Sequence, residues 1–244
     1  MAEILGDQRV QSEVLEGLSM CKNHRKWFAG FAVPYLGEHP IEVSAGLGDY
    51  AEEWFAHVPR MTVSEVEPDR LVALKERFGN DTNMDVRELM LPASEPANYS
   101  AAVSYNVLEH IEDDIGALRS IATMLEPGGR AVILVPAFQA LYGSLDRDLG
   151  HFRRYTRRSL ARVMQAAGFR MERTFYFNAV GCLGWWWNGR VRRIDRIPVG
   201  QLRSFDSLVP LLRVEDAIPL PAGQSVIGIG SLVGSRMLRR SRRV

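Results

Sequence analysis

The sequence predicts an α/β fold with a doubly wound, mostly parallel sheet. Apolar strand-like runs alternate with amphipathic helical stretches from residue 41 to about residue 180. Because helices would connect the strands, right-handed crossovers and a parallel sheet are expected. A second observation is the segment 41–50, in which an apolar strand carrying an acid runs into a two-glycine turn and then a helix. Such a turn is typical of sheets that bind nucleotides.

Proline and capping residues mark where the helices begin. Pro68 suits the first position of one helix, Asp113 or Asp114 can cap another, and Thr156 can cap a third. The apolar runs between these helices are expected to be strands, and residues 127–129 are expected to form a turn. The expected strands are one that ends near Glu42, residues 61–66, one that ends near Asp85, and residues 101–105, 131–135, 171–177 and 225–233.

The chain length of 244 residues suits one α/β domain with a modest insertion. Three tryptophans and four prolines interrupt the strand and helix alternation after residue 180. We therefore expect a helical insert there that acts as a substrate lid. The expected organisation is an amino-terminal helical cap over the pocket (1–40), a core (41–180), the insert (181–222), the last strand (223–235) and a basic tail (236–244).

Composition restricts the class of partner. The 30 basic and 29 acidic residues nearly cancel, so the overall charge does not favour a nucleic acid. Cys21 and Cys182 lie far apart and show no metal-ligand spacing, which suits a reducing, cytoplasmic location, and no metal is expected. No signal peptide or transmembrane segment is visible; the short apolar run 180–187 could at most contact a membrane surface. The oligomeric state does not follow from the sequence.

The glycine turn alone fits two cofactor classes. Gly46, Gly48 and Ala51 satisfy the loose dinucleotide-binding pattern, and Glu65 has the spacing of an acid that binds a ribose hydroxyl. Further polar residues are expected at the carboxyl ends of other strands, where open α/β sheets bind ligands. A cofactor with an ammonium, a ribose diol and an exocyclic amine needs three separated acceptors, whereas a nicotinamide dinucleotide needs one.

At this point the chain resembles the class I S-adenosylmethionine-dependent methyltransferases of small-molecule type. The resemblance covers roughly residues 20–180, with a weaker match at 223–229. It implies a seven-stranded, Rossmann-like sheet whose last strand is antiparallel, and S-adenosyl-L-methionine as cofactor. The matching segments, in order, are 42–48 (EVSAGLG), 65–68 (EVEP), 84–86 (MDV), 106–111 (NVLEHI) and 125–129 (LEPGG).

The resemblance also implies residue roles, which are carried over position by position. Ser44 stands where the family usually has its first glycine, so it would add a hydroxymethyl group near the methionine part of the cofactor. The implied cofactor-binding residues are Gly46 and Gly48 close to the cofactor, Glu42 toward its amino-acid end, Glu65 on the ribose, Asp85 and the Val86 backbone on the adenine, and Asn106 with Val107 beside the methionine side.

A second candidate site lies at residues 150–156. His151 is the candidate catalytic base, and Arg153, Arg154 and Tyr155 are candidates for holding an anionic acceptor. The competing interpretation is a solvated loop that leads into a capped helix. His24 and Trp27, on the amino-terminal helix expected to cover the pocket, are further candidates for substrate contact, whereas His110 is expected to pack or cap.

The predicted function is therefore methyl transfer from S-adenosyl-L-methionine to an oxygen or nitrogen atom of a small-molecule acceptor, either anionic or lipid-like. Two alternatives stay open. One is a nicotinamide-dependent oxidoreductase that uses the same turn, and the other is a methyltransferase-like module that binds without catalysis.

Overall fold

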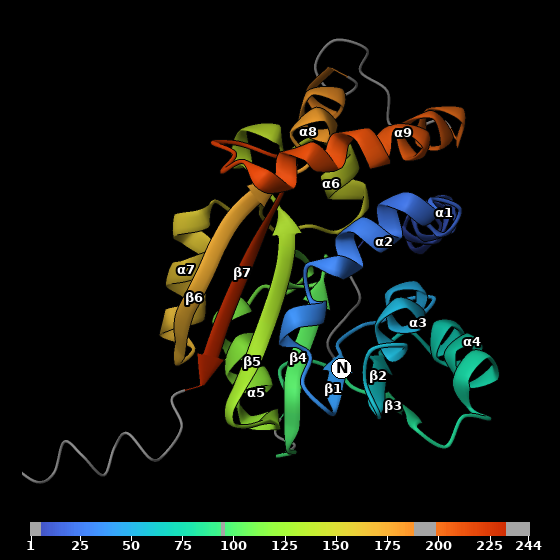
Figure 1. Cartoon of the computed structure of the whole chain (residues 1–244), viewed down its shortest axis with the longest axis vertical. Coiled ribbons are helices and arrows are strands. Elements are labelled where there is room, and N and C mark those ends of the chain that lie inside the picture. Colours follow the sequence, from blue (N-terminus) through green and yellow to red (C-terminus); the bar gives the residue numbers. More distant parts are fainter. Residues whose placement is uncertain (1–5, 94–95, 188–198, 233–244) are drawn as a thin grey trace, which may run out of the picture.

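The computed structural model describes residues 6–93, 96–187 and 199–232, and shows one seven-stranded sheet with helices on both faces (Figure 1). The strand order is β3-β2-β1-β4-β5-β7-β6, and β7 runs antiparallel to both of its neighbours. This confirms the predicted doubly wound sheet with a reversed last strand. The strands are β1 (Pro40–Glu42), β2 (Met61–Glu65), β3 (Met84–Glu88), β4 (Tyr99–Tyr105), β5 (Leu125–Pro136), β6 (Phe169–Phe177) and β7 (Ser225–Leu232).

The two faces of the sheet carry separate apolar cores because successive strand residues point to opposite sides. On β5, Val132 and Leu134 belong to one core and Ile133 to the other. Helices α2, α3 and α4 cover the first face, and α5 and α7 cover the second. The helices are α1 (Gln8–Ser19), α2 (Lys22–Gly30), α3 (Asp49–Phe55), α4 (Pro68–Phe78), α5 (Asp114–Met124), α6 (Ser144–Asp148), α7 (Arg157–Ala166), α8 (Ala179–Trp186) and α9 (Val199–Leu212), with 3-10 turns η1 (Val33–Tyr35), η2 (Leu108–His110), η3 (Gln139–Leu141) and η5 (Arg213–Ala217).

Three helix starts follow from the capping chemistry of the sequence. Pro68 is the first residue of α4, where its missing N–H costs no hydrogen bond. The side chains of Asp113 and Thr156 accept hydrogen bonds from backbone N–H groups in the first turns of α5 and α7. The expected boundaries of these helices are confirmed.

Two local expectations are wrong. The third strand does not end near Asp85, because β3 continues to Glu88 in register with β2. The expected turn at 127–129 lies within β5, where Gly128 has a φ of +89° and the pairing with β4 shifts between Tyr99 and Ala101. The extra residues form a bulge, which a glycine with positive φ permits.

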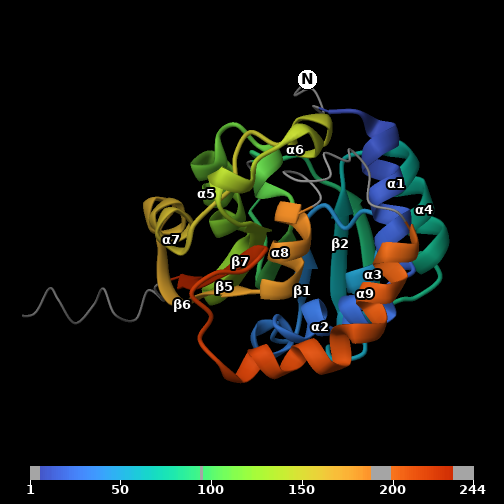
Figure 2. The same cartoon turned by 90° about the horizontal axis from the view of Figure 1, so that it is seen from above.

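Helices from both ends of the chain lie over the carboxyl ends of the strands. Viewed from above, α1, α2, α8 and α9 surround this edge of the sheet (Figure 2). Helix α2 contacts α9, so the amino-terminal segment and the 181–222 region form one cover. Residues 188–198 of that region, with Arg190, Arg192 and Arg193, and the predicted basic tail lie outside the described residues.

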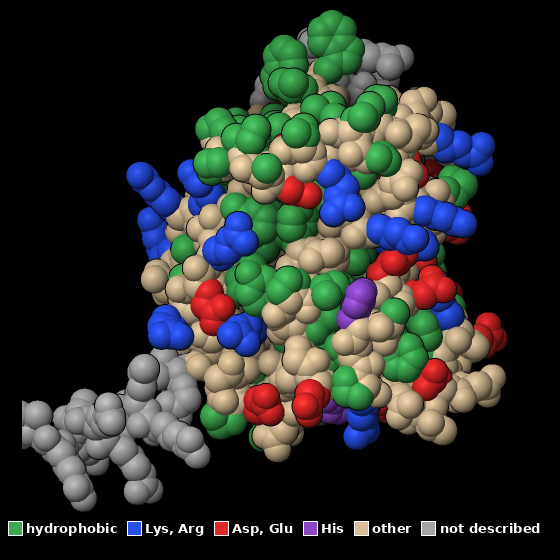
Figure 3. All heavy atoms as spheres, viewed as in Figure 1, with side chains coloured by type: hydrophobic (Ala, Val, Ile, Leu, Met, Phe, Trp, Pro, Cys, Tyr) green, Lys and Arg blue, Asp and Glu red, His purple; other side chains and the backbone are tan. Residues whose placement is uncertain are grey.

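The outer surface of α8 and α9 carries exposed apolar side chains. Figure 3 shows apolar side chains gathered over α8 and α9. Leu183 and Trp186 are exposed on α8, and Trp187 is exposed directly after it. Leu208 and Leu211 are exposed on α9. In the described part of the chain, no helix is both long and apolar enough to cross a bilayer.

The structure predicts that Gly48→Ala destabilises the fold. Gly48 has a φ of +79°, and an added Cβ would lie 2.5 Å from Cε2 of Phe78 and 2.8 Å from Cδ2 of Leu74. Left-handed strain and overpacking together should cost about 2–4 kcal/mol and lower the Tm by on the order of 10 °C. Gly30→Ala is the control, because nothing lies within 4 Å of its added Cβ. Equal melting temperatures for the two variants would contradict the packing assigned to Gly48.

Candidate functional site

A cavity of about 970 Å³ opens at the carboxyl ends of β1, β2, β4 and β5. Glu42, Glu65, Tyr105 and Pro136, the last residues of these four strands, all line it. Side chains of α1, α2, α8 and α9 also line it, together with loops that follow the strands and residues of the segment 145–154. This is the edge at which open α/β sheets bind ligands, so we take this cavity as the candidate site.

The turn after β1 divides into a part that faces the cavity and a part that packs. Gly46 has a φ of +59° and lines the cavity, and an added Cβ would meet only the Leu15 side chain, at 3.4 Å. Ser44 also lines the cavity, with a φ of +55°, a conformation that favours glycine. Gly48 does not line it, because its backbone lies against Leu74 and Phe78 of α4. Gly48 therefore shapes the turn, whereas the backbone of Ser44 and Gly46 is placed to approach a ligand closely.

Glu65 is buried at the end of β2 and connects it to the glycine turn. Its Oε2 accepts a hydrogen bond of 2.8 Å from the Gly46 N–H, and Oε1 accepts from the N–H groups of Val66 and Glu67. An ionised carboxylate offers about four acceptor positions, so three backbone bonds leave capacity for a ligand hydroxyl. These bonds hold the Glu65 carboxylate in place before any ligand binds.

Glu42 is a buried acid at the end of β1 whose Oε2 has no hydrogen-bond partner among the described residues. Burial, followed by the negative charges of Glu65 and Asp49, raises the pKa of Glu42 well above its ordinary value. An unpaired buried carboxylate is costly, and a cationic ligand group beside it would remove that cost. The arrangement suits the ammonium of an amino-acid moiety.

The predicted adenine contacts are in the wrong place. Asp85 is the second residue of β3, pairs with Thr62 and is exposed, and neither Asp85 nor Val86 lines the cavity. The residues that do line it beyond β3 are an apolar segment with no acid, namely Leu89, Met90, Leu91 and Pro92. The prediction failed because the strand is longer than its apolar pattern indicated, which moves Asp85 toward the opposite end.

Asn106 and Val107 both line the cavity directly after β4. Asn106 has a φ of +54°, which asparagine tolerates better than most residues. Its N–H donates to the Leu134 carbonyl at 2.9 Å, so the turn is anchored to β5. The structure brings these two residues together with Glu42, Ser44, Gly46 and Glu65 around one cavity.

His151 lines the same cavity and is held by a buried acid. Its Nδ1 lies 2.8 Å from Oδ1 of Asp146, whose side chain is fully buried. Burial acts to raise the pKa of Asp146, but hydrogen bonds from His151 and Arg154 outweigh it, so this pKa lies below its usual range. With Nδ1 engaged as donor to Asp146, the lone pair of His151 Nε2 is free for another partner.

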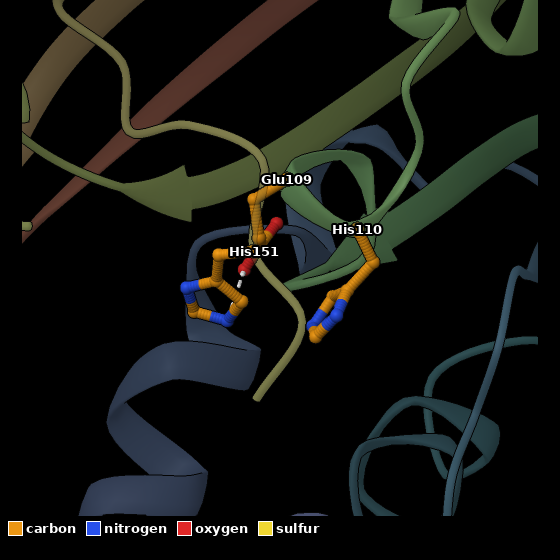
Figure 4. A group of neighbouring side chains, drawn as sticks. All are labelled: Glu109, His110 and His151. Atoms are coloured by element: carbon orange, nitrogen blue, oxygen red, sulfur yellow. Dashed lines mark ion pairs between the residues drawn. The ribbon is translucent and has the colours of Figure 1, made fainter. Parts of the chain in front are cut away.

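Glu109 and His110, on η2, lie beside His151 (Figure 4). The two imidazole rings are nearly perpendicular, with centroids 4.6 Å apart, and His151 Nε2 lies 4.0 Å from Oε1 of Glu109. Burial raises the pKa of Glu109 to about 7, against the opposing charge of His151. Burial, followed by the charge of His151, lowers the pKa of His110 to about 3. His110 was expected only to pack or cap, but it lines the cavity beside His151.

Arg153 and Tyr155 point away from the cavity, contrary to their predicted role in acceptor binding. Arg153 pairs with Asp114 at 2.8 Å and donates to the Glu112 carbonyl. The buried Tyr155 hydroxyl donates to the same Asp114 at 2.9 Å. The competing interpretation of a solvated loop that leads into a capped helix is correct for the entry into α7, but wrong for the solvation of Tyr155, which is buried.

Arg154 lines the cavity but is not free to bind an anion. Its Nε and Nη2 donate to the two carboxylate oxygens of Asp146 at 2.7 and 3.0 Å, and its guanidinium lies 4.8 Å from the centre of the Trp185 ring. This geometry corrects its predicted role as an anion clamp. Arg154 fixes Asp146, which in turn fixes His151, so it is a positioning residue.

Of the two residues on α2 that were predicted to contact substrate, only His24 lines the cavity. Its ring lies 3.8 Å from that of Phe28, centre to centre. Burial lowers the pKa of His24 to about 4, against the opposing charge of Asp206. Trp27 is buried, does not line the cavity, and donates from Nε1 to Asp216 at 2.9 Å. The substrate contact predicted for Trp27 is therefore not possible in this arrangement.

Comparison with known proteins decides which cofactor class this cavity serves. A family model described as a methyltransferase domain matches residues 31–174, more than half of the chain. The chain belongs to this methyltransferase family. The predicted resemblance is thereby confirmed, and S-adenosyl-L-methionine is its cofactor.

A curated relative is the ubiquinone/menaquinone biosynthesis C-methyltransferase of Rubrivivax gelatinosus, 28% identical over 115 residues. The match covers 46% of this chain and 45% of that protein, so the two are similar over less than half of either length.

Solved structures share the fold at low identity. A methyltransferase in complex with the Trm112 activator of Haloferax volcanii has a TM-score of 0.62 at 12% identity, covering 91% of this chain and 95% of that one. The N-methyltransferase NodS of Bradyrhizobium japonicum, in complex with S-adenosyl-L-homocysteine, has a TM-score of 0.52 at 14% identity, covering 80% and 78%. These similarities establish a shared fold.

The residues present fit this cofactor. The unpartnered oxygen of Glu42 suits its ammonium, the fixed carboxylate of Glu65 suits its ribose hydroxyls, and the open backbone at Gly46 leaves room between them. An apolar wall at Leu89 and Met90 can contact the face of a purine ring. Glu42, Gly46 and Glu65 are among the residues that the sequence proposed, whereas Gly48 and the adenine-side residues Asp85 and Val86 lie outside the cavity.

Glu65 and Asp85 provide a matched test of the cofactor site. Glu65→Gln should weaken S-adenosyl-L-homocysteine binding about 10- to 100-fold, because it removes a charge and sets an amide NH₂ against backbone donors. Asp85→Asn should leave the affinity unchanged within twofold, since Asp85 lies outside the cavity. Isothermal titration calorimetry measures both, and thermal melting verifies the fold. Equal losses in the two variants would contradict the placement of the site.

Proposed function

We propose that this chain transfers a methyl group from S-adenosyl-L-methionine to an oxygen or nitrogen atom of a small, lipid-like acceptor in the cytoplasm. The observation that carries the proposal is the shared cavity, which joins the cofactor-side acids Glu42 and Glu65 to an oriented histidine, His151. Two free cysteines, Cys21 and Cys182, suit a reducing compartment.

The residues of the chain divide the work between the two ends of the cavity. When bound, S-adenosyl-L-methionine supplies a methyl group on a positively charged sulfur. Glu65 and the Gly46 backbone would hold the ribose, and Glu42 would face the ammonium. His151 is fixed through Nδ1 by Asp146 and would present Nε2 to the acceptor. There it would take the proton of the acceptor and so favour the ionised form of the acceptor. Alignment of the two reactants and exclusion of water supply the rest of the rate enhancement.

The cover over the cavity supports a lipid-like acceptor rather than an anionic one. Arg153 and Arg154, the two arginines predicted to bind an anion, are engaged with Asp114 and Asp146. The cavity walls on α8 and α9 include Val180, Phe205 and Leu208. The outer surface of the same helices carries exposed apolar side chains as well, which suits contact with a membrane surface that delivers such an acceptor. The curated relative is named for quinone biosynthesis, which is in line with an apolar acceptor.

The test is transfer of radioactive methyl from S-adenosyl-L-methionine to a panel of apolar phenols, catechols and amines, with products identified by mass spectrometry. His151→Gln should lower kcat about 10²- to 10⁴-fold and leave S-adenosyl-L-homocysteine affinity unchanged. Arg153→Gln, whose side chain points away from the cavity, is the matched control and should retain kcat.

Two results would overturn the proposal. Saturable binding of reduced nicotinamide dinucleotide without binding of S-adenosyl-L-homocysteine would favour the oxidoreductase alternative. Full kcat in His151→Gln would show that His151 does not act on the acceptor.

A further inference from the structure

We propose that Glu109, His110 and His151 bind one divalent metal ion of the Zn²⁺, Mn²⁺ or Co²⁺ class at the acceptor end of the cavity. The sequence alone predicts no metal, because Glu109 and His151 are 42 positions apart and only the fold brings the three residues together. The role suggested below rests on the proposed function, whereas the binding itself does not.

The distances between the potential ligand atoms of Glu109, His110 and His151 are short enough for all three residues to bind one ion. One potential ligand atom from each residue lies within 4.8 Å of the other two, and His151 Nε2 is 4.0 Å from Glu109 Oε1. Ligand atoms bonded to one ion at about 2.1 Å lie roughly 3–3.5 Å apart. Side-chain adjustments of about 1 Å would therefore complete the site, without any change in the backbone elements.

The Glu109 carboxylate is the strongest sign of a missing partner. Its side chain is completely buried, and neither oxygen has a hydrogen-bond partner among the described residues. Burying a charged carboxylate without a partner is unfavourable, and a bound cation removes that cost. Figure 4 shows the carboxylate directed toward the His151 ring. Such a cation would lie between the two.

His151 has the outer contacts that fix a metal-binding tautomer. The Nδ1 of His151 is engaged by Asp146, which Arg154 and the Gly143 N–H hold in turn. Metal-binding histidines commonly use one ring nitrogen in this way, which directs the other toward the ion. The His110 ring lies beside that of His151, with ring centroids 4.6 Å apart.

The ligand set also indicates the kind of ion and its task. Two imidazoles and one carboxylate suit zinc and the first-row transition metals better than Mg²⁺ or Ca²⁺, which favour oxygen ligands. Three protein ligands leave positions open toward the cavity, as in catalytic metal sites. An acceptor hydroxyl bound there would release its proton to solvent. Its oxygen would then take the methyl group while the sulfur keeps the bonding electron pair.

The experiment is an optical titration of the untagged, chelator-treated full chain with Co²⁺, whose visible d–d absorption reports nitrogen and oxygen coordination. We expect one equivalent to bind and Zn²⁺ to displace it. Glu109→Gln, His110→Gln and His151→Gln should each weaken Co²⁺ binding at least tenfold. His57→Gln, which changes an exposed histidine outside the cavity, is the matched control and should bind normally.

The outcomes separate this inference from the proposed function. Circular dichroism and S-adenosyl-L-homocysteine binding of each variant show whether it is folded. Absence of Co²⁺ binding to the wild-type chain, or binding that survives all three ligand substitutions, would overturn the metal site. If metal-free protein transfers methyl groups at the full rate, His151 acts as a direct base and the proposed function stands without the ion. Stoichiometric Co²⁺ binding lost in the three variants supports the site even if every acceptor fails.

Discussion

The hydrogen bond from the Gly46 N–H to the Glu65 carboxylate is the contact on which the rest of the site depends. It joins the turn after β1 to the end of β2 at 2.8 Å, in the buried base of the cavity. Because parallel strands end at one edge, this bond holds two neighbouring strand ends at a fixed separation. The turn that it fixes carries the open backbone of Gly46, and Glu42 lines the cavity at the end of β1.

A second buried unit shapes the opposite end of the cavity. Asp146 accepts hydrogen bonds from Arg154, His151 and the Gly143 backbone, so one carboxylate orients the whole segment between α6 and α7. Because such a network is costly to bury unless it is satisfied, its completeness indicates that the direction of His151 is fixed in the folded chain. The Glu65 end and the His151 end of the cavity are thus both fixed by buried hydrogen bonds, and α1, α2, α8 and α9 line the cavity beside them.

The sheet and the cofactor-side residues could be predicted because their signals are local. A buried strand, two glycines and an acid at the next strand end are enough to place Gly46 and Glu65. The prediction that Asp85 contacts the adenine was wrong because an apolar pattern does not show how many polar residues a strand includes at its end. The prediction that Arg153 and Tyr155 bind the acceptor was wrong for another reason. Neighbouring residues in an extended segment point to different sides, and the sequence does not show which side faces the cavity.

The residues that sequence reasoning missed are those whose meaning depends on burial. Glu109 and Asp146 resemble surface acids in the sequence, and only the fold shows that both are completely buried beside histidines. The available signal was that an acid and a histidine, Glu109 and His110, are adjacent in the sequence shortly after the end of β4.

The central claim is that a single cavity joins the Glu65 end to the His151 end. A crystal structure of the chain with S-adenosyl-L-homocysteine bound tests it most directly. The account predicts the ribose hydroxyls on Glu65, the sulfur directed toward His151 and Glu109, and Asp85 without ligand contact. A ligand bound outside this cavity, or one whose sulfur faces away from His151, would contradict it.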